Sequence, residues 1–120
     1  MNLFPGKIVA RGQIEAGGGM LAYDADAFDA SVGAVVDVGI RAEDIVIGAD
    51  GGGLPFSHEF VEELGATRVI HGTVAGQPLE FVTPAAAEIT AGKTLSVRPT
   101  SPAAVHVFDP VSGRSLRRSE

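Results

Sequence analysis

The sequence predicts an all-β fold, and three observations support this prediction. Apolar residues recur with a period of about two much more often than with the helical period of about 3.6. The segments that show this alternation are short, rich in Val and Ile, and bounded by Gly or Pro. Turn signals separate them at intervals of about 8–12 residues, which is typical of a small barrel or sandwich.

The first half of the chain contains four predicted strands. Lys7–Ile14 and Ala34–Ile40 carry the clearest alternation, and three consecutive glycines at 17–19 mark a turn between them. The helical signal here is confined to Ala25–Ala30, which has enough pattern for a turn or two. In order, the predicted strands are Lys7–Ile14, Met20–Tyr23, Ala34–Ile40 and Asp44–Ile47.

The second half contains five predicted strands, of which Thr67–Val74 and Thr94–Arg98 have the strongest β pattern. Pro84–Glu88 is predicted to form a short helical turn, because Pro is tolerated at the first position of a helix. In order, the predicted strands are Phe56–Leu64, Thr67–Val74, Gln77–Val82, Thr94–Arg98 and Val105–Phe108.

The two halves resemble each other in sequence. Val9–Ile14 resembles Val69–Val74, and Gly33–Val38 resembles Gly92–Val97. We therefore predict two half-barrels that complete each other's sheets, an arrangement that removes exposed sheet edges. Gly48–Leu54 is the predicted flexible hinge between them, since consecutive glycines resist a single conformation.

The charge balance and composition exclude several classes of function. Fifteen acidic against nine basic residues give a net charge of −6, which disfavours a protein that binds nucleic-acid phosphates. Arg114, Arg117 and Arg118 are interpreted as part of a solvated tail, because lipid or nucleic-acid patches usually hold more charges. The absence of Cys removes disulfides, thiolate metal sites and cysteine nucleophiles. Nothing in the chain has the pattern of a membrane span or secretory signal.

One segment resembles the end of a phosphate-binding loop but lacks its essential features. Gly92-Lys93-Thr94 would need a glycine at position 87, where the chain has Ala87, and Glu88 would place a carboxylate among the phosphates. The residues that follow are strand-like, so the helix N-terminus that would hold a phosphate is missing. We expect no nucleotide binding and no ATP hydrolysis by this chain.

Other groups of polar residues also fall short of a metal or catalytic site. The three histidines are isolated in the sequence, and the alternating aspartates lack the Gly and Glu of a calcium loop. The paired glutamates have no nucleophile beside them, and an adjacent Ser-His pair does not make a catalytic relay. The residues weighed in this way are His58, His71 and His106; Asp24, Asp26 and Asp29; Glu59, Glu62 and Glu63; and Ser57.

Four motifs, in the same order along the chain, resemble those of one protein family. Met1–Gly6 is similar to a Met-Asn-Phe-x-Pro-Gly stretch, and Gly39–Asp44 to a Gly-Ile-Arg-Pro-Glu motif. Val61–Gly65 is similar to Val-Glu-x-Leu-Gly, and Val105–Asp109, followed by Ser112-Gly113, to His-x-Phe-Asp…Thr/Ser-Gly. The family is the C-terminal transport-associated OB (TOBE) regulatory domain of carbohydrate-type ABC importer ATP-binding subunits, similar to those for maltose and glycerol-3-phosphate.

The resemblance implies an OB-like split β-barrel built from two half-units, with residues 1–120 as a single domain of the TOBE/MOP-like type. It also implies that the chain is a fragment of a longer subunit, whose separate ATPase domain binds ATP and magnesium. The sequence departs from the family at Ala42, where the family has Pro, and at Glu63, where Pro is frequent. Ala42 leaves φ unfixed and restores an N–H group at this turn.

The function implied is that of a non-catalytic regulatory and dimerisation domain. Expected partners are a second copy of the chain, the ATPase domain of the same subunit and, through it, the membrane permease subunits; in some relatives a regulatory protein also binds. The expected location is cytoplasmic, peripheral on the inner face of the membrane. No catalytic, metal-binding or cofactor-binding residue and no nucleic-acid partner are expected in this chain. The alternative is an OB-type domain that senses a small ligand or an oxyanion.

The candidate regulatory and interface residues all lie in the matching motifs: Gly39, Arg41, Glu43, Glu62, Gly65 and Phe108. Arg41 and Glu43 are either a turn-fixing ion pair or interface residues. Glu62 and Gly65 are expected near a regulatory or inter-subunit surface, and Phe108 is either core or contact. Gly39 and Gly65 are expected at backbone positions that a side chain would obstruct.

Overall fold

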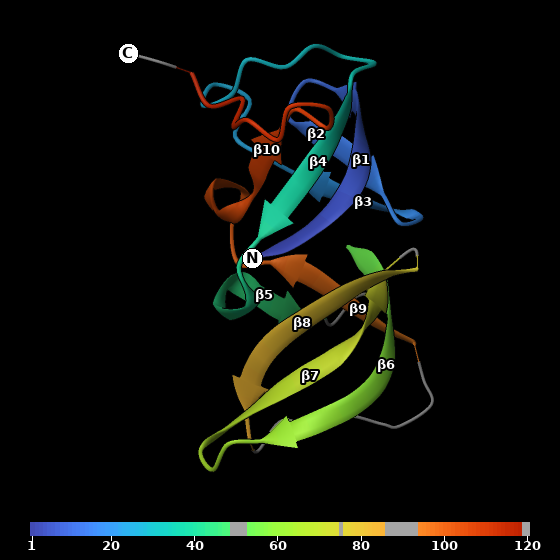
Figure 1. Ribbon diagram of the computed structural model, residues 1–120, viewed down its shortest axis with the longest axis vertical. Coiled ribbons are helices and arrows are strands. Elements are labelled where there is room, and N and C mark those ends of the chain that lie inside the picture. The colour runs from blue at the N-terminus through green and yellow to red at the C-terminus, as the bar shows by residue number, and fades with distance from the viewer. Residues whose placement is uncertain (49–52, 75, 86–93, 119–120) are drawn as a thin grey trace.

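The computed structural model describes residues 1–48, 53–74, 76–85 and 94–118. Within these ranges ten β-strands form two five-stranded antiparallel sheets, and the helical elements are two short 3-10 helices. The sheets lie one above the other along a molecule measuring 41 × 26 × 25 Å (Figure 1). The predicted all-β, barrel-like fold is therefore confirmed.

Each sheet takes four strands from one half of the chain and one from the other. The first, in spatial order, contains β10 (His106–Phe108), β4 (Val35–Ile40), β1 (Asn2–Ala10), β2 (Gln13–Ala16) and β3 (Gly19–Ala22). The second contains β5 (Ile45–Ile47), β9 (Thr94–Pro99), β6 (Leu54–Glu63), β7 (Thr67–Val74) and β8 (Gln77–Pro84).

The two half-units exchange their last strands. In the first half, β4 is followed by the 3-10 helix η1 (Ala42–Asp44), and β5 then joins the second sheet. In the second half, β9 is followed by η2 (Pro102–Ala104), and β10 then joins the first sheet. The prediction that two half-units complete each other's sheets is thus confirmed (Figure 1).

Only one of the two sequence echoes behind that prediction marks equivalent elements. Val35–Val38 lies in β4 as Thr94–Val97 lies in β9, and both strands precede a 3-10 helix; residues 92 and 93 of the second segment lie outside the described ranges. Val9–Ile14, in contrast, crosses the turn between β1 and β2, whereas Val69–Val74 lies wholly within β7. The first echo was therefore a coincidence between Val- and Gly-containing segments.

The prediction of a single strand at Lys7–Ile14 is wrong, because a hairpin turn interrupts this segment. Ala10 pairs with Gln13 across the two-residue turn Arg11-Gly12, in which Gly12 has φ +81°. The apolar alternation continues in phase through this turn, so the sequence reads as one strand. Gly12 supplies the positive φ that tight hairpin turns require.

The other eight predicted strands are present, with bounds within two residues of the prediction. The predicted helical turn at Ala25–Ala30 is wrong. The Ala27 N–H instead bonds to Asp24 in a turn, and Phe28 forms a β-bridge with Arg117. Pro84 ends β8 rather than opening a helix. Residues 86–88 of that prediction, 87–93 of the rejected phosphate loop and 49–52 of the predicted hinge lie outside the described ranges.

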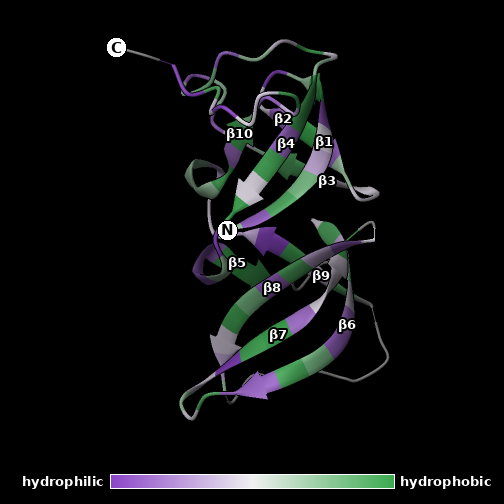
Figure 2. Ribbon diagram, in the orientation of Figure 1, coloured by the Kyte–Doolittle hydropathy of each residue, from purple (hydrophilic) through white to green (hydrophobic). Residues whose placement is uncertain are grey.

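One apolar core runs through both sheets. Its buried side chains come from both halves and include Ile8 and Val38 in the first sheet and Phe56 and Phe81 in the second. The Phe56 and Phe81 rings pack edge to face with centroids 5.3 Å apart. Hydrophobic and hydrophilic residues alternate along the strands (Figure 2), as expected for sheets with one face on a core.

The side chain of Asn2 joins the two sheets at the start of β1. It is 8% exposed, and its Nδ2 donates hydrogen bonds to the carbonyl oxygens of Ile40 at 3.1 Å and Glu80 at 2.8 Å. Its Oδ1 accepts a hydrogen bond of 2.9 Å from the Glu80 N–H. The amide group thus bonds both the N–H and the carbonyl oxygen of Glu80, as the backbone of a paired strand would. These bonds hold the N-terminal segment against β8.

Candidate interaction surface

A hollow of about 520 Å³ lies where the start of β1 meets the outer face of β6, β7 and β8. Apolar and acidic side chains make up most of its lining, and among the described residues no Lys or Arg side chain contributes to it. We call it the junction hollow. Its lining residues are Met1, Asn2, Leu3, Glu59, Phe60, His71, Gly72, Thr73, Pro78, Leu79 and Glu80.

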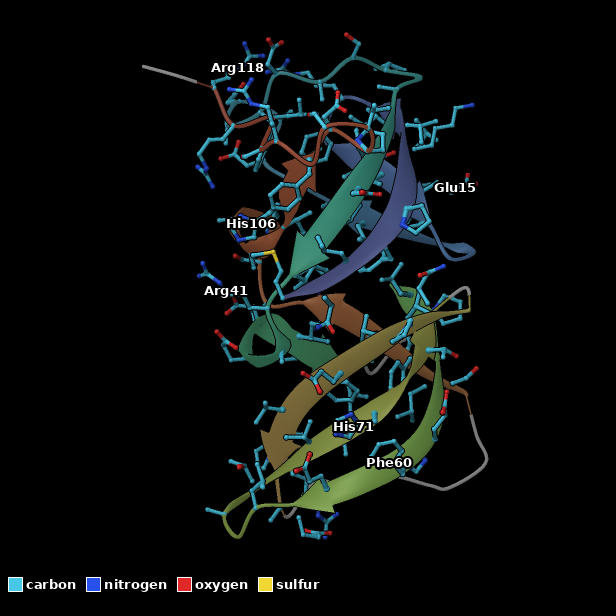
Figure 3. The ribbon with its side chains drawn as sticks, viewed as in Figure 1. Glu15, Arg41, Phe60, His71, His106 and Arg118 are labelled. Atoms are coloured by element: carbon cyan, nitrogen blue, oxygen red, sulfur yellow. The ribbon has the colours of Figure 1, made fainter. Side chains whose placement is uncertain are left out.

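His71 is held between two carboxylates and an aromatic ring. Its Nε2 lies 3.0 Å from Oε1 of Glu62, and its Nδ1 lies 3.3 Å from Oε2 of Glu80. The Phe60 ring stacks on the imidazole with centroids 4.3 Å apart and an interplanar angle of 9°. Figure 3 shows Phe60 and His71 side by side on neighbouring strands. Phe60 and Glu80 are both cross-strand neighbours of His71, Phe60 on β6 and Glu80 on β8.

An irregularity in β6 determines which side chains reach this face. The pairing with β7 shifts between His58 and Phe60, so Glu59 is an extra residue in the strand. After the shift, Phe60 and Glu62 face outward, toward His71. His58 lies on the other side of the irregularity, and its buried Nε2 has no hydrogen-bond partner within the described ranges.

Glycine at position 72 permits the close approach of β6 and β7 beneath the hollow. A Cβ there would collide with the carbonyl oxygen of Ser57 and lie 2.6 Å from the Phe56 ring. Because the Ser57 oxygen belongs to the backbone of the neighbouring strand, it cannot rotate away. Gly72 is therefore a requirement of this packing.

A second group of apolar side chains lies next to the hollow, over Gly39 in β4. A Cβ at Gly39 would lie 2.6 Å from the Met1 sulfur, 2.7 Å from the Phe108 ring and 3.2 Å from Leu3. Met1 and Leu3 are 57% and 53% exposed. Since both also line the junction hollow, an apolar surface runs from Phe108 across Met1 and Leu3 into the hollow. We call the Met1, Leu3 and Phe108 portion the β4 patch.

Polar residues lie near the β4 patch: His106 on β10 pairs with Gly39, and Arg41 precedes η1. Arg41 and Glu43 are both exposed, and the structure contains no ion pair between these two described residues. The pKa of His106 is lowered from 6.5, first by burial and then by the positive charges of Arg41 and Arg117; Asp44 partly opposes this. His106 is therefore neutral at pH 7. Figure 3 shows Arg41 and His106 on the same side of the molecule.

The turn after Phe108 explains the last sequence motif in physical terms. Oδ1 of Asp109 accepts hydrogen bonds from the N–H groups of Val111 at 2.8 Å and Ser112 at 2.9 Å. These bonds hold the pKa of the Asp109 carboxyl below its usual value. Gly113 closes the turn with φ +74°. The motif thus builds a turn that follows β10 and returns the chain beside it.

The structure brings some of the sequence-predicted residues together and separates others. Gly39 lies beneath the β4 patch and Phe108 forms part of it, and the charge of Arg41 acts on His106, which pairs with Gly39. Glu62 lies beside the junction hollow through its contact with His71, and Glu43 is exposed in η1. Gly65 is distant, in the β6–β7 turn, where φ is +89° and no described atom lies within 4 Å of the position that a Cβ would take. Its role there is conformational. The residues at the junction that sequence reasoning missed are Asn2, Leu3, Phe60, His71 and Glu80.

Within the described ranges, no group of three or more His, Asp or Glu side chains is placed to hold a metal ion. The same ranges contain no helix that is long and apolar enough to cross a membrane.

The relatives found by comparison with known proteins are named as ATP-binding proteins. The family model described as "MalK OB fold domain" matches residues 1–45. The chain is 42% identical to the sn-glycerol-3-phosphate import ATP-binding protein UgpC of Jannaschia sp., over 97% of this chain and 32% of that protein. It is 37% identical to UgpC 2 of Agrobacterium fabrum, over 68% of this chain and 21% of that protein. A putative ATP-binding protein of Brucella abortus is 34% identical over 67% of this chain and 23% of its own length. The chain thus spans about a third or less of the relatives it matches.

Proposed function

The chain belongs to the OB-fold domains of carbohydrate-type ABC importer ATP-binding subunits, and from this premise we propose that it pairs two such subunits and receives a regulatory partner. In this role it performs no chemistry itself. It holds two ATPase domains at high effective concentration while they open and close. A partner that prefers one of these states would bias the equilibrium between them.

The observation that carries the pairing proposal is the exposure of the β4 patch. Leu3 is 53% exposed on β1 and lies over Gly39 together with Phe108. Contiguous exposed apolar side chains of this kind often mark an interface. Two identical copies most often pair through the same patch on each, which here places Leu3 and Phe108 of both copies at the contact.

We propose that ATP binding and hydrolysis, and the contacts with permease subunits, belong to the portion of the relatives outside the matched share. The proposed location follows from the same relatives: the cytoplasmic side of the membrane, as part of a transporter. The names of the relatives favour glycerol-3-phosphate or a related sugar-type compound as the transported solute. The alternative of an oxyanion sensor receives no support from the junction hollow, which is lined by the carboxylates Glu59 and Glu80 and by no Lys or Arg among the described residues.

The pairing proposal is tested by sedimentation equilibrium at increasing protein concentration in low and high salt. We expect a weak dimer that is more populated at high salt, because the −6 charge on each copy opposes association and salt screens it. Leu3→Lys should remove the dimer. Val111→Lys is the matched control, because Val111 is an exposed apolar residue (95%) in the turn after Phe108.

A chain that stays monomeric at millimolar concentration in both salts would contradict the proposal. So would an equal loss of dimer in the Leu3→Lys and Val111→Lys variants, because the effect would then come from net charge rather than from the β4 patch.

A further inference from the structure

We infer that the junction hollow binds an arginine residue, flanked by apolar residues, from a segment of a separate partner protein. This inference deepens the regulatory part of the proposed function and rests on it. Met1 and Leu3 belong both to the hollow and to the β4 patch, so a bound segment and a second copy would compete for them, and the experiment below distinguishes the two.

The charges of the hollow select a cation. Glu59 and Glu80 line it, and Glu62 reaches His71 from its edge. The nearest basic side chain on these strands, Arg68, bonds to Glu63 through its Nε at 3.0 Å and does not line the hollow. An anionic segment would therefore meet only like charge from the carboxylates here.

The aromatic ring selects a planar cation. Phe60 is 56% exposed although His71 is stacked against it, so part of the ring remains open to a ligand. A guanidinium group can lie on an aromatic face and still donate paired hydrogen bonds to a carboxylate. A lysine ammonium is a compact charge that cannot do both in this way. Arg is therefore the better match.

The charged part of the site is already held in position. Each ring nitrogen of His71 lies within hydrogen-bonding distance of a carboxylate, Glu62 on one side and Glu80 on the other. The Glu80 backbone is in turn bonded to Asn2. These contacts reduce the conformational freedom that Glu62, Glu80 and His71 lose when a ligand binds, and such preorganisation favours affinity.

Four further lining residues are apolar, and they indicate the neighbours of the arginine. Met1 and Leu3 form one wall and are more than half exposed, and Pro78 and Leu79 belong to β8 on the other side. Apolar residues on both sides of the arginine would cover Met1, Leu3 and Pro78, whereas Leu79 is already buried in the core.

The occupant is not the basic tail of this same chain. The Arg117 guanidinium lies 5.1 Å from the centre of the Phe28 ring, and the backbones of Leu116 and Arg118 are hydrogen-bonded to Asp29 and Ala27. This tail lies at the far end of the molecule from Phe60 and His71 (Figure 3). The same bonds hold the tail of any second copy, whose net charge of −6 also opposes docking on an acidic hollow.

The test uses three synthetic peptides of the form acetyl-Leu-Leu-X-Leu-Leu-amide, in which X is Arg, Lys or Gln. Binding to the chain is followed by amide and aromatic chemical shifts in NMR, at concentrations where the chain is monomeric. The Arg peptide should bind saturably and shift the resonances of Phe60 and His71. The Gln peptide should bind at least tenfold more weakly, with the Lys peptide between them.

Two variants locate the site. Phe60→Leu should weaken binding of the Arg peptide by about threefold to tenfold, and Glu80→Gln should weaken it by a similar factor that shrinks in high salt. Glu15→Gln is the matched control, because it removes one exposed carboxylate from β2 in the other sheet (Figure 3). It should leave the affinity within twofold.

Equal affinity for the Arg and Gln peptides would overturn the inference, as would equal effects of Glu80→Gln and Glu15→Gln. It is also overturned if concentrating the chain alone shifts Phe60 and His71 and Phe60→Leu abolishes the shift, since the occupant would then be a second copy. Failure of all peptides to bind, with the Leu3-dependent dimer intact, would refute the inference and leave the pairing proposal standing.

Discussion

Replacing Asn2 by alanine should lower the free energy of unfolding by about 3 kcal/mol. The side chain makes three hydrogen bonds, two to Glu80 in the other sheet and one to Ile40 in its own, and is 8% exposed. A hydrogen bond in a folded protein contributes about 1 kcal/mol net, and a buried group left without a partner costs at least as much. Alanine would leave the Glu80 N–H and the carbonyl groups of Ile40 and Glu80 without their Asn2 partner.

Urea unfolding at pH 7 measures this loss. With a slope of about 2 kcal/mol per molar urea, the midpoint should fall by about 1.5 M. Asn2→Asp should be at least as destabilising, because it keeps one acceptor but places a carboxylate against two carbonyl oxygens. The control is Gln13→Ala, which removes an exposed amide side chain from β2 and should change stability by less than about 0.5 kcal/mol. A loss below about 1 kcal/mol for Asn2→Ala, or equal losses for the two alanine variants, would refute the proposed joint between the sheets.

Three further predictions follow from the fold. Ala42→Pro should raise the free energy of unfolding by about 0.4–1 kcal/mol, measured in urea. Pro102 is the first residue of the equivalent helix η2, and Arg41 already has the extended backbone (φ −73°, ψ 147°) that proline requires of the residue before it. A destabilised variant would contradict the equivalence of η1 and η2. Gly72→Ala should cost about 2 kcal/mol or more, since its methyl group would meet the Ser57 carbonyl, and a neutral result would disprove that close approach. The pKa of His106 in the folded chain lies below the ordinary 6.5, so the unfolded chain takes up this proton first and stability falls as the pH drops below about 6.5. His106→Gln should therefore make this fall in stability less steep. An unchanged pH dependence would argue against the lowered pKa.

The sequence could predict the strands and the division into two half-units because both depend on local pattern. Thr67–Val74 is found with the predicted bounds, since alternation and flanking turns both define it. The hairpin at Arg11-Gly12 was missed because a two-residue turn preserves the phase of the alternation. The equivalence of β4 and β9 was visible in sequence, whereas the exchange of β5 and β10 required the sheet pairings.

The junction hollow could not be predicted from the sequence, because it depends on register. Phe60 and Glu62 reach His71 only after the extra residue Glu59 shifts the alternation of β6. Asn2 belongs to the first of the four motifs, yet its partner Glu80 is 78 residues away. The sequence analysis includes Gly39 and Phe108 among its candidate residues, but not Met1 and Leu3, which also lie over Gly39.

Paramagnetic broadening between copies tests the central claim, pairing through the β4 patch, most directly. The chain has no Cys, so Arg41→Cys provides one site for a spin label beside the patch. Labelled chain at natural isotopic abundance is mixed with ¹⁵N-labelled wild-type chain at dimer-forming concentration. The account predicts broadening of the amides of Leu3, Gly39 and Phe108 in the ¹⁵N-labelled copy, with those around Gly65 unaffected. Broadening centred on the Gly65 turn, or none at a concentration where sedimentation shows a dimer, would contradict it.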